Sequence, residues 1–297
     1  MKLLRTPDEY FKNLPDYPFK PNYLNIDGIR IHYVDEGPKD TEVVLLMHGE
    51  PSWSYLYRYM IPILAEAGYR VIAPDLVGFG RSDKPTEKED HTYRKHVSWI
   101  SKLVNMLDLK NITLFCQDWG SLIGLRVAIE NQERFNRILL SNGGLPTGEQ
   151  KMGKAFLDWQ HFSKTASKFD VGNLIQSATV NKLTKDVLKA YDAPFPDDTY
   201  KAGARILPSL VPTSKDDPEH EANKKAWEGF FKWNKPFLTA FSDSDPITRG
   251  GDKFFQKSIP GARGQHHVTI KDAGHFLQED KGPELANLII EFIEKNP

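Results

Sequence analysis

At 297 residues, the chain is long for one compact domain and suits an α/β core that carries an insertion. Its 39 Lys and Arg nearly balance its 40 Asp and Glu, and the net charge of -1 gives no electrostatic footprint for nucleic acid or for an acidic membrane surface. A small neutral molecule is the kind of partner that this balance favours.

The single cysteine, Cys116, excludes an intrachain disulfide, and nothing in the sequence argues for an oxidising compartment. Residues 1–9 lack an apolar core of signal-peptide length, and no apolar run approaches the roughly 18 residues of a membrane-spanning helix. These features predict a soluble, cytoplasmic protein.

The predicted elements begin with a hairpin, in which the largely apolar residues 23–26 and 29–34 flank the turn dipeptide Asp27-Gly28. Strands and helices then alternate. Strands are expected at 43–47, 70–73, 112–116 and 137–141, and helices at 54–67, 93–107 and 122–129. This alternation predicts an α/β fold with a mostly parallel, twisted sheet, right-handed crossovers and flanking helices.

The alternation stops after residues 142–146, and no further strand is predicted before Lys235. Three helices are expected in between, at 155–168, 173–191 and 219–231. We therefore predict a helical cap domain at 146–228, inserted into a core domain formed by 1–145 and 229–297. The core is completed by strands at 236–241 and 267–270 and by a helix at 283–295.

The turn at residues 115–121 joins a predicted strand to a predicted helix and is the centre of the predicted site. In α/β-hydrolases the nucleophile lies on such a strained turn between small residues. Here Cys116 and Gly120 hold the small positions and Asp118 the nucleophile position. Taken alone, the stretch is equally compatible with an ordinary strand-to-helix connection whose aspartate caps the helix.

An aspartate at this position indicates a particular chemistry. A carboxylate is already ionised at neutral pH and needs no base before it attacks carbon. Its attack produces an ester, which a water molecule activated by another residue must then hydrolyse. The sequence should therefore contain a histidine and a second acid downstream.

Candidates for both roles follow the last two predicted strands. Asp243 and Asp245 come after the strand at 236–241, and His275 comes after the strand at 267–270. Nucleophile, acid and histidine thus occur in the α/β-hydrolase order, each after a strand end. We favour Asp245 over Asp243 because Pro246 and Ile247 resemble the start of a new element. Each residue taken alone could also be an ordinary surface-loop residue.

The loop at His48-Gly49-Glu50-Pro51 directly follows the strand at 43–47. A backbone N–H in this loop and that of the residue after the nucleophile form the oxyanion hole in this fold, so Glu50 and Trp119 are the expected donors. The alternative is a Gly-Pro turn with a structural histidine. The Gly-x-Gly at 78–80 has no third glycine and no helix is predicted to begin at it, which argues against a dinucleotide-binding site. The spacing of the histidines predicts no metal site.

These residues together resemble the haloalkane dehalogenases of the α/β-hydrolase superfamily over nearly the whole chain. The similar segments are 48–51 (His-Gly-Glu-Pro), 117–121 (Gln-Asp-Trp-Gly-Ser), 193–197 (Ala-Pro-Phe-Pro-Asp) and 272–276 (Asp-Ala-Gly-His-Phe). The resemblance implies that Asp118 is the nucleophile, His275 the base and Asp245 the acid. It implies hydrolysis of haloalkanes to a primary alcohol and halide through an aspartyl ester. No cofactor and no metal are expected, and we expect a monomer.

The glutamate at position 50 resembles the subfamily that holds halide between two tryptophans, whereas another subfamily has asparagine there. By this resemblance Trp119 is the first tryptophan, and Trp159, in the first predicted cap helix, is the second. Indole N–H groups donate hydrogen bonds from a large apolar body, which suits halide binding in a dry pocket. The alternative for Trp159, with Phe156 and Phe162 nearby, is a helix face packed on the core.

Soluble epoxide hydrolases are the nearest alternative, because they share the fold, the Asp-Trp-Gly turn and the ester intermediate. Their ring opening resembles a reaction for two cap tyrosines, for which Tyr191 and Tyr200 are available. Glu50 and Gln117 are more similar to those of dehalogenases. Fluoroacetate dehalogenases are disfavoured because Trp119 and Leu122 stand where arginines are expected. A non-catalytic receptor is disfavoured because every catalytic role has a candidate residue.

Overall fold

A twisted sheet of eight strands, β10-β9-β8-β7-β4-β5-β3-β2, is the central element of the computed structural model, which describes residues 1–297. Its strands are β2 (Asn22–Ile26), β3 (Ile29–Glu36), β4 (Val43–Met47), β5 (Arg70–Pro74), β7 (Ile112–Asp118), β8 (Phe135–Gly143), β9 (Phe237–Ser242) and β10 (Val268–Ile270). Only β2 and β3 run antiparallel to their neighbours. The predicted α/β-hydrolase sheet is therefore confirmed.

The edge hairpin forms because its turn residues accept a left-handed backbone. Asp27 has φ 54° and Gly28 has φ 81°, as a two-residue turn between twisted strands requires. The central strands β4 and β7 are instead apolar almost throughout and buried on both faces, as parallel strands covered by helices must be.

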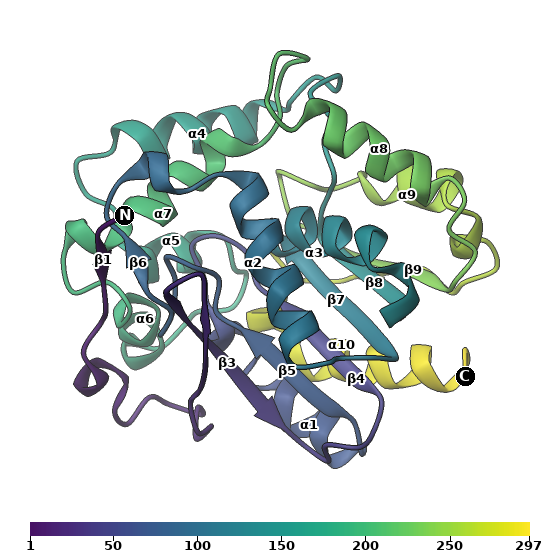
Figure 1. Ribbon diagram of the computed structural model, residues 1–297, viewed down its shortest axis with the longest axis horizontal. Coiled ribbons are helices and arrows are strands. Elements are labelled where there is room, and N and C mark those ends of the chain that lie inside the picture. The colour runs from purple at the N-terminus through teal and green to yellow at the C-terminus, as the bar shows by residue number, and fades with distance from the viewer.

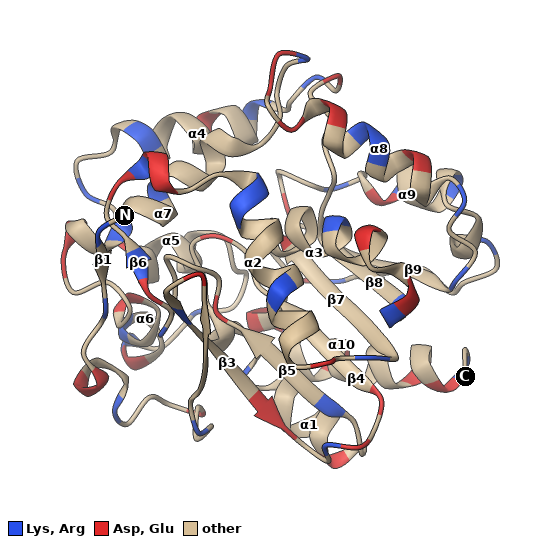
Figure 2. Ribbon diagram, in the orientation of Figure 1, with Lys and Arg blue, Asp and Glu red and all other residues tan.

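Ten α-helices surround the sheet. They are α1 (Met60–Glu66), α2 (Tyr93–Met106), α3 (Trp119–Glu130), α4 (Lys154–Thr165), α5 (Val171–Ser177), α6 (Lys185–Asp192), α7 (Ala202–Ile206), α8 (His220–Phe230), α9 (Asp252–Ser258) and α10 (Leu277–Glu294). In Figure 1, α4, α7 and α8 lie above the sheet, and α5 and α6 lie to its left. Charged residues of both signs are spread over helices and loops and do not gather in one region of the view (Figure 2). No helix combines the length and the apolar composition that crossing a bilayer requires.

Helix α2 illustrates how local sequence determines an element. Thr92 caps it, since its side chain accepts a hydrogen bond from the backbone N–H of Lys95. Its apolar residues recur at helical spacing and are buried: Val97, Ile100, Leu103 and Val104. The helix expected at 93–107 is confirmed.

Two other expected helices differ from the prediction. Residues 54–57 form a 3-10 turn, and only Met60–Glu66 of the predicted 54–67 is α-helical. The predicted helix at 173–191 is two helices, α5 and α6, and the short α7 was not expected at all. Between α5 and α6 the chain is not helical, because the backbone N–H groups of Val180 and Asn181 donate to the carboxylate of Asp280 on α10.

The helices α4 to α8 all lie between β8 and β9, where the cap was predicted. Helix α6 is tied to the core by the Trp53 indole, which donates to the carbonyl of Ala190 at 3.1 Å, and by the Tyr191 hydroxyl, which donates to Glu279. Helix α8 is tied to the core as well, since the Trp227 indole donates to the carbonyl of Leu145 at 2.8 Å. The cap boundaries at 146 and 228 stay a prediction.

Removal of the buried charge of Glu279 tests how the α6 contact is stabilised. Arg58 forms a two-pronged ion pair with Glu279, and both side chains are 1% exposed. Glu279→Gln keeps the shape but leaves a buried guanidinium without its counterion, so we expect the free energy of unfolding in urea to fall by about 3–5 kcal/mol. Lys102→Gln, which breaks an exposed pair with Asp27, should change it by less than about 1 kcal/mol. Equal losses in the two variants would contradict this reasoning.

Candidate active site

Asp118 lies on a strained turn between β7 and α3. Its backbone has φ 51° and ψ -129°, a region that non-glycine residues rarely adopt. The strand end of β4 approaches this turn so closely that a Cβ on Gly120 would stand 2.0 Å from the carbonyl oxygen of Met47, and one on Gly49 would stand 2.3 Å from Cβ of Asp118. Side-chain-free residues are therefore required on both sides of the turn.

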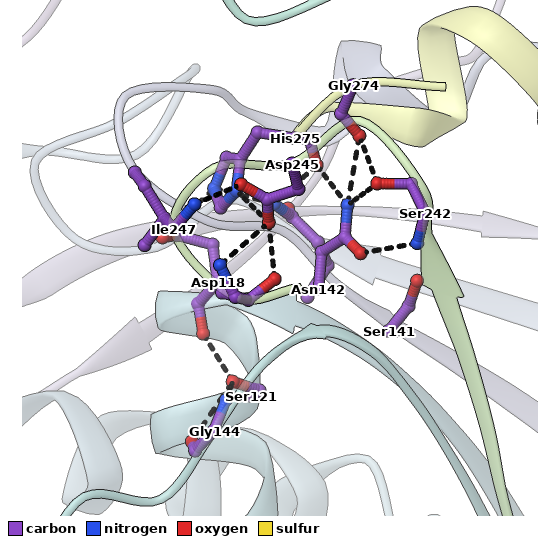
Figure 3. A network of polar contacts seen from close by, with 12 residues as sticks. Asp118, Ser121, Ser141, Asn142, Gly144, Ser242, Asp245, Ile247, Gly274 and His275 are labelled. Carbon is purple, nitrogen blue, oxygen red and sulfur yellow. Dashed lines mark hydrogen bonds and ion pairs between the residues drawn. The ribbon is translucent and has the colours of Figure 1, made fainter. Parts of the chain in front are cut away.

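Ser121 supports the turn from below, as Figure 3 shows. Its hydroxyl donates to the carbonyl of Asp118 at 2.5 Å and accepts the N–H of Gly144 at 2.9 Å. The loop after β8 is thus hydrogen-bonded to the first turn of α3. The backbone strain at Asp118 is maintained by contacts from two neighbouring strands.

The loop after β4 supplies a donor to the carboxylate. The backbone N–H of Glu50 donates to Oδ1 of Asp118 at 2.7 Å. His48 orients this loop: its Nε2 accepts the N–H of Leu76 at 2.9 Å, so its Nδ1 carries the proton and donates to the carbonyl of Gly49 at 2.9 Å. Burial lowers the pKa of His48, which keeps the ring neutral in this role.

His275 faces the carboxylate from the loop after β10. Its Nε2 lies 3.3 Å from Oδ2 of Asp118, and its Nδ1 lies 2.9 Å from Oδ2 of Asp245. Burial lowers the pKa of the imidazole, but the charge of Asp245 and the hydrogen bond with Asp118 outweigh burial and raise it to about 10. While both carboxylates are charged, the ring is therefore an imidazolium at neutral pH.

Asp245 is held in place by the start of the following element. Its carboxylate accepts the N–H of Ile247 at 2.9 Å (Figure 3). The hydroxyl of Thr248 also donates to this carboxylate. Burial raises the pKa of this carboxyl, but the charge and hydrogen bond of His275 lower it to about 2. Asp243 contacts the hydroxyl of Ser244 and not the histidine. The structure thus brings Asp245 to His275 and leaves Asp243, which is half-buried, away from the histidine.

Asn142 is a site residue that the sequence reasoning missed. Its side-chain NH₂ donates to the carbonyls of Gly274 at 2.9 Å and His275 at 3.0 Å, and its Oδ1 accepts the N–H of Ser242 at 2.8 Å (Figure 3). One amide therefore joins the ends of β8 and β9 to the histidine loop. Its place directly after the strand expected at 137–141 was the available signal, because the same rule selected the acids.

Gln117 is the second residue that was not assigned a role. Its Nε2 donates to the carbonyl of His275 at 3.2 Å and lies 3.1 Å from Nε2 of the ring. Its place directly after the strand expected at 112–116 and before Asp118 was the available signal. Two side-chain amides, from Gln117 and Asn142, thus converge on the backbone carbonyl of the histidine.

Two cavities, of about 240 and 390 Å³, meet at Asp118. Both are lined by Glu50, Asp118, Trp159 and Ile247, and their walls are mostly apolar. Trp119 and Trp159 both line the larger cavity. Such a cavity suits a small apolar molecule beside a charged nucleophile.

The side chains of the two tryptophans are supported differently. Trp119 is buried, with its ring 5.1 Å from that of Tyr93. Trp159 is half-buried and stacks on Phe162 at 5.8 Å. Phe156, on the same helix, also lines the larger cavity, whereas Phe162 does not. The α4 face therefore contributes both to the cavity wall and to packing within the cap.

The carboxyl of Glu50 is buried, and its Oε1 has no hydrogen-bond partner. Burial, followed by the charge of Asp118, raises the pKa of this carboxyl well above its usual range, although the indole of Trp159 acts in the opposite direction. The carboxyl group of Glu50 therefore holds its proton more tightly than an exposed glutamate does.

The tyrosines expected for epoxide opening are not at the cavities. Tyr191 is fully buried and donates its hydroxyl to Glu279. Tyr200, in the turn after the Pro-rich segment at 194–196, lines neither cavity. The epoxide hydrolase alternative is therefore not favoured.

Comparisons with known proteins agree with this geometry. The family model for the alpha/beta hydrolase fold matches residues 42–282. A haloalkane dehalogenase of Psychrobacter cryohalolentis is 58% identical over the full length of both chains, and one of Mycolicibacterium paratuberculosis is 50% identical over 98% of both. A tetrameric haloalkane dehalogenase from Paraglaciecola agarilytica superimposes with a TM-score of 0.91 at 38% identity, covering 97% of both chains. The chain belongs to the haloalkane dehalogenases of the α/β-hydrolase fold.

Proposed function

We propose that this enzyme hydrolyses carbon–halogen bonds of small haloalkanes with Asp118 as nucleophile, His275 as base and Asp245 as the acid that orients the base. One observation carries the assignment of roles. The imidazole of His275 lies between the two carboxylates, 3.3 Å from Asp118 and 2.9 Å from Asp245, beside cavities with apolar walls. Family membership supports the reaction class.

In the first step an oxygen of Asp118 forms a bond to the saturated carbon, and the carbon–halogen bond breaks, so that the halide leaves with the electron pair. Oδ1 accepts the N–H of Glu50 at 2.7 Å, whereas Oδ2 is 3.3 Å from Nε2 of His275, so the more weakly held Oδ2 is the attacking oxygen. The product is a neutral ester whose carbonyl oxygen is Oδ1. The Glu50 N–H, with that of Trp119 as the second donor, then stabilises the charge that develops on this oxygen in the next step.

Trp119 and Trp159 supply the halide site in this proposal. A departing halide is too weak a base for protonation to assist it, so hydrogen bonds in a cavity from which water is excluded must stabilise it. Both residues line the cavity that contains Asp118. The raised pKa of Glu50 assists them, because an ionised carboxylate at this place would repel the halide.

In the second step His275 takes a proton from water, and the resulting hydroxide attacks the ester carbonyl carbon. The bond from this carbon to the oxygen that carries the alkyl group then breaks, the departing alkoxide takes the proton from the imidazolium to give the alcohol, and the carboxyl group of Asp118 is regenerated. Ester formation itself prepares the base. It removes the charge of Asp118, which is one of the groups that raise the pKa of His275, so the ring loses its proton more readily in the ester than in the free enzyme. Asp245 keeps its charge and stabilises the imidazolium when the proton arrives.

Three features of the organisation belong to the same proposal. The helices between β8 and β9, residues 146–228, act as a cap that closes the cavity over the core. The chain works in the cytoplasm. It acts as a monomer, although the relative from Paraglaciecola agarilytica is tetrameric.

Replacement of His275 separates the two steps. His275→Gln removes the base but leaves Asp118 and its donor in place, so the first step proceeds and the ester persists. Incubation with 1-bromobutane should release about one equivalent of bromide per enzyme, and intact-mass spectrometry should show one butyl adduct. Exposed His266 gives the control, because His266→Gln should turn over normally. Absence of an adduct in His275→Gln would remove the two-step scheme.

Removal of the Asp118 charge should shift the titration of His275. Both the hydrogen bond and the charge of Asp118 raise the pKa of the ring, so we expect it to fall below about 10 in Asp118→Asn, as ¹⁵N NMR of the imidazole would measure. Because the pKa of the ring is raised in the folded protein, protonation of His275 stabilises the fold. This contribution is complete below pH 6.5, the usual pKa of the group, and is lost as the pH rises through about 10. The wild type should therefore lose stability relative to Asp118→Asn across this window. An unchanged ring pKa would contradict the charge argument.

Halide affinity tests the roles of the tryptophans. Trp159→Phe keeps an aromatic ring but loses the N–H, and loss of one hydrogen bond to an ion should weaken bromide binding by about tenfold or more. Quenching of the remaining tryptophan fluorescence by bromide measures the affinity. Trp233→Phe, which alters a buried indole without a hydrogen-bond partner, serves as the control. Equal bromide affinity in Trp159→Phe and Trp233→Phe would exclude Trp159 from the halide site.

A further inference from the structure

We propose that Asp280 is a positioning residue for ester hydrolysis, because its carboxylate holds a wall of the cavity and the loop of His275 in one arrangement. The inference rests on the proposed function, in which His275 activates water. It concerns a residue in the first turn of α10 that lines neither cavity.

Three backbone N–H groups from two distant segments meet at this carboxylate. Gly274, the residue before the histidine, donates to Oδ2 at 2.8 Å. Asn181 donates to Oδ1 at 2.7 Å, and Val180 donates to Oδ2 at 3.0 Å. The side-chain amide of Asn181 also donates to the backbone carbonyl of Asp280 at 3.2 Å. Hydrogen bonds to an ionised acceptor are about twice as strong as neutral ones, so this is the main attachment between the two segments.

A second contact lies on the other side of the histidine. The N–H of Phe276 donates to the carbonyl of Ala178 at 3.2 Å. The two backbones are so close that a Cβ on Gly274 would stand 2.4 Å from the same carbonyl oxygen. Phe276 is therefore hydrogen-bonded to the segment 178–181 directly, and Gly274 is attached to it through Asp280. The carbonyl of His275 itself accepts hydrogen bonds from Gln117 and Asn142.

The two joined segments also line the same cavity. Residues 177–180 and 274–276 line the smaller cavity, together with Asp118. A shift of the segment between α5 and α6 would therefore move the imidazole relative to the nucleophile. Misplacement of a catalytic group by about 1 Å can slow a step by about a hundredfold.

The two chemical steps depend on this attachment to different degrees. The displacement of halide uses Asp118, the N–H of Glu50 and the tryptophans, none of which contacts Asp280. Hydrolysis uses His275, whose neighbours on both sides are held by the attachment. Loss of the Asp280 carboxylate should therefore slow the second step selectively.

Asp280→Asn is the sharpest variant, because the amide keeps the shape but turns an NH₂ group towards backbone donors. We expect rapid mixing with saturating 1-bromobutane to give a bromide burst within about twofold of the wild-type rate, and the butyl ester to decay at least about tenfold more slowly by intact-mass analysis. Asp280→Glu retains the charge, so its butyl ester should decay at a rate between those of the wild type and Asp280→Asn. Amide hydrogen exchange should increase together in peptides 178–182 and 272–277 of Asp280→Asn.

Asp192→Asn is the matched control. Asp192 accepts the N–H of Gly172 at 3.0 Å within the cap and does not contact the histidine loop. It should leave ester decay unchanged. Equal slowing of bromide release and ester decay in Asp280→Asn would overturn the proposal. Equal rates of ester decay in Asp280→Asn and Asp192→Asn would also overturn it. If the wild type released no bromide, the proposed function would fail instead, and exchange in the two peptides would still report whether Asp280 joins them.

Discussion

The arrangement of the site depends on one strained backbone position. Asp118 is held at φ 51° at the end of β7, and this conformation directs its carboxylate out of the sheet, between the N–H of Glu50 and the ring of His275. The strain persists because β4 and β7 pair in parallel up to Met47 and Cys116, and the glycines at positions 49 and 120 have no side chain that would separate them. If the strand ends moved apart, the carboxylate would lose both its donor and its base.

In the proposed mechanism, electrostatics around this carboxylate explains how one site performs two different steps. An imidazole between two carboxylates is charged in the free enzyme and therefore does not compete with Asp118 as a nucleophile. When the ester forms, one of the two negative charges is removed and the ring becomes a base. Burial raises the pKa of Glu50 and so opposes a further negative charge here, which lets the cavity receive an apolar haloalkane beside Asp118.

In the proposed arrangement the helices α4 to α8 form a cap, and buried contacts attach this cap to the core. Trp53, Arg58 and Tyr191 form buried contacts on one side of α6, and Asp280 joins the preceding segment to the histidine loop. The cavity therefore lies between two bodies that are bound at several points around its edge. Variation in the cap can change the shape of the cavity while the backbone around Asp118 stays constant.

The amino-acid sequence alone determined the sheet, the alternation of strands and helices and the chain order of Asp118, Asp245 and His275, because hydrophobic periodicity and strand ends are local signals. It did not determine the break between α5 and α6, the existence of α7 or the roles open to Asn142, Gln117 and Asp280. These features arise from hydrogen bonds between residues far apart in the chain, such as Gly274 and Val180 on one carboxylate. Only the folded structure brings those backbone groups together, so only the tertiary structure decides which polar side chains satisfy them.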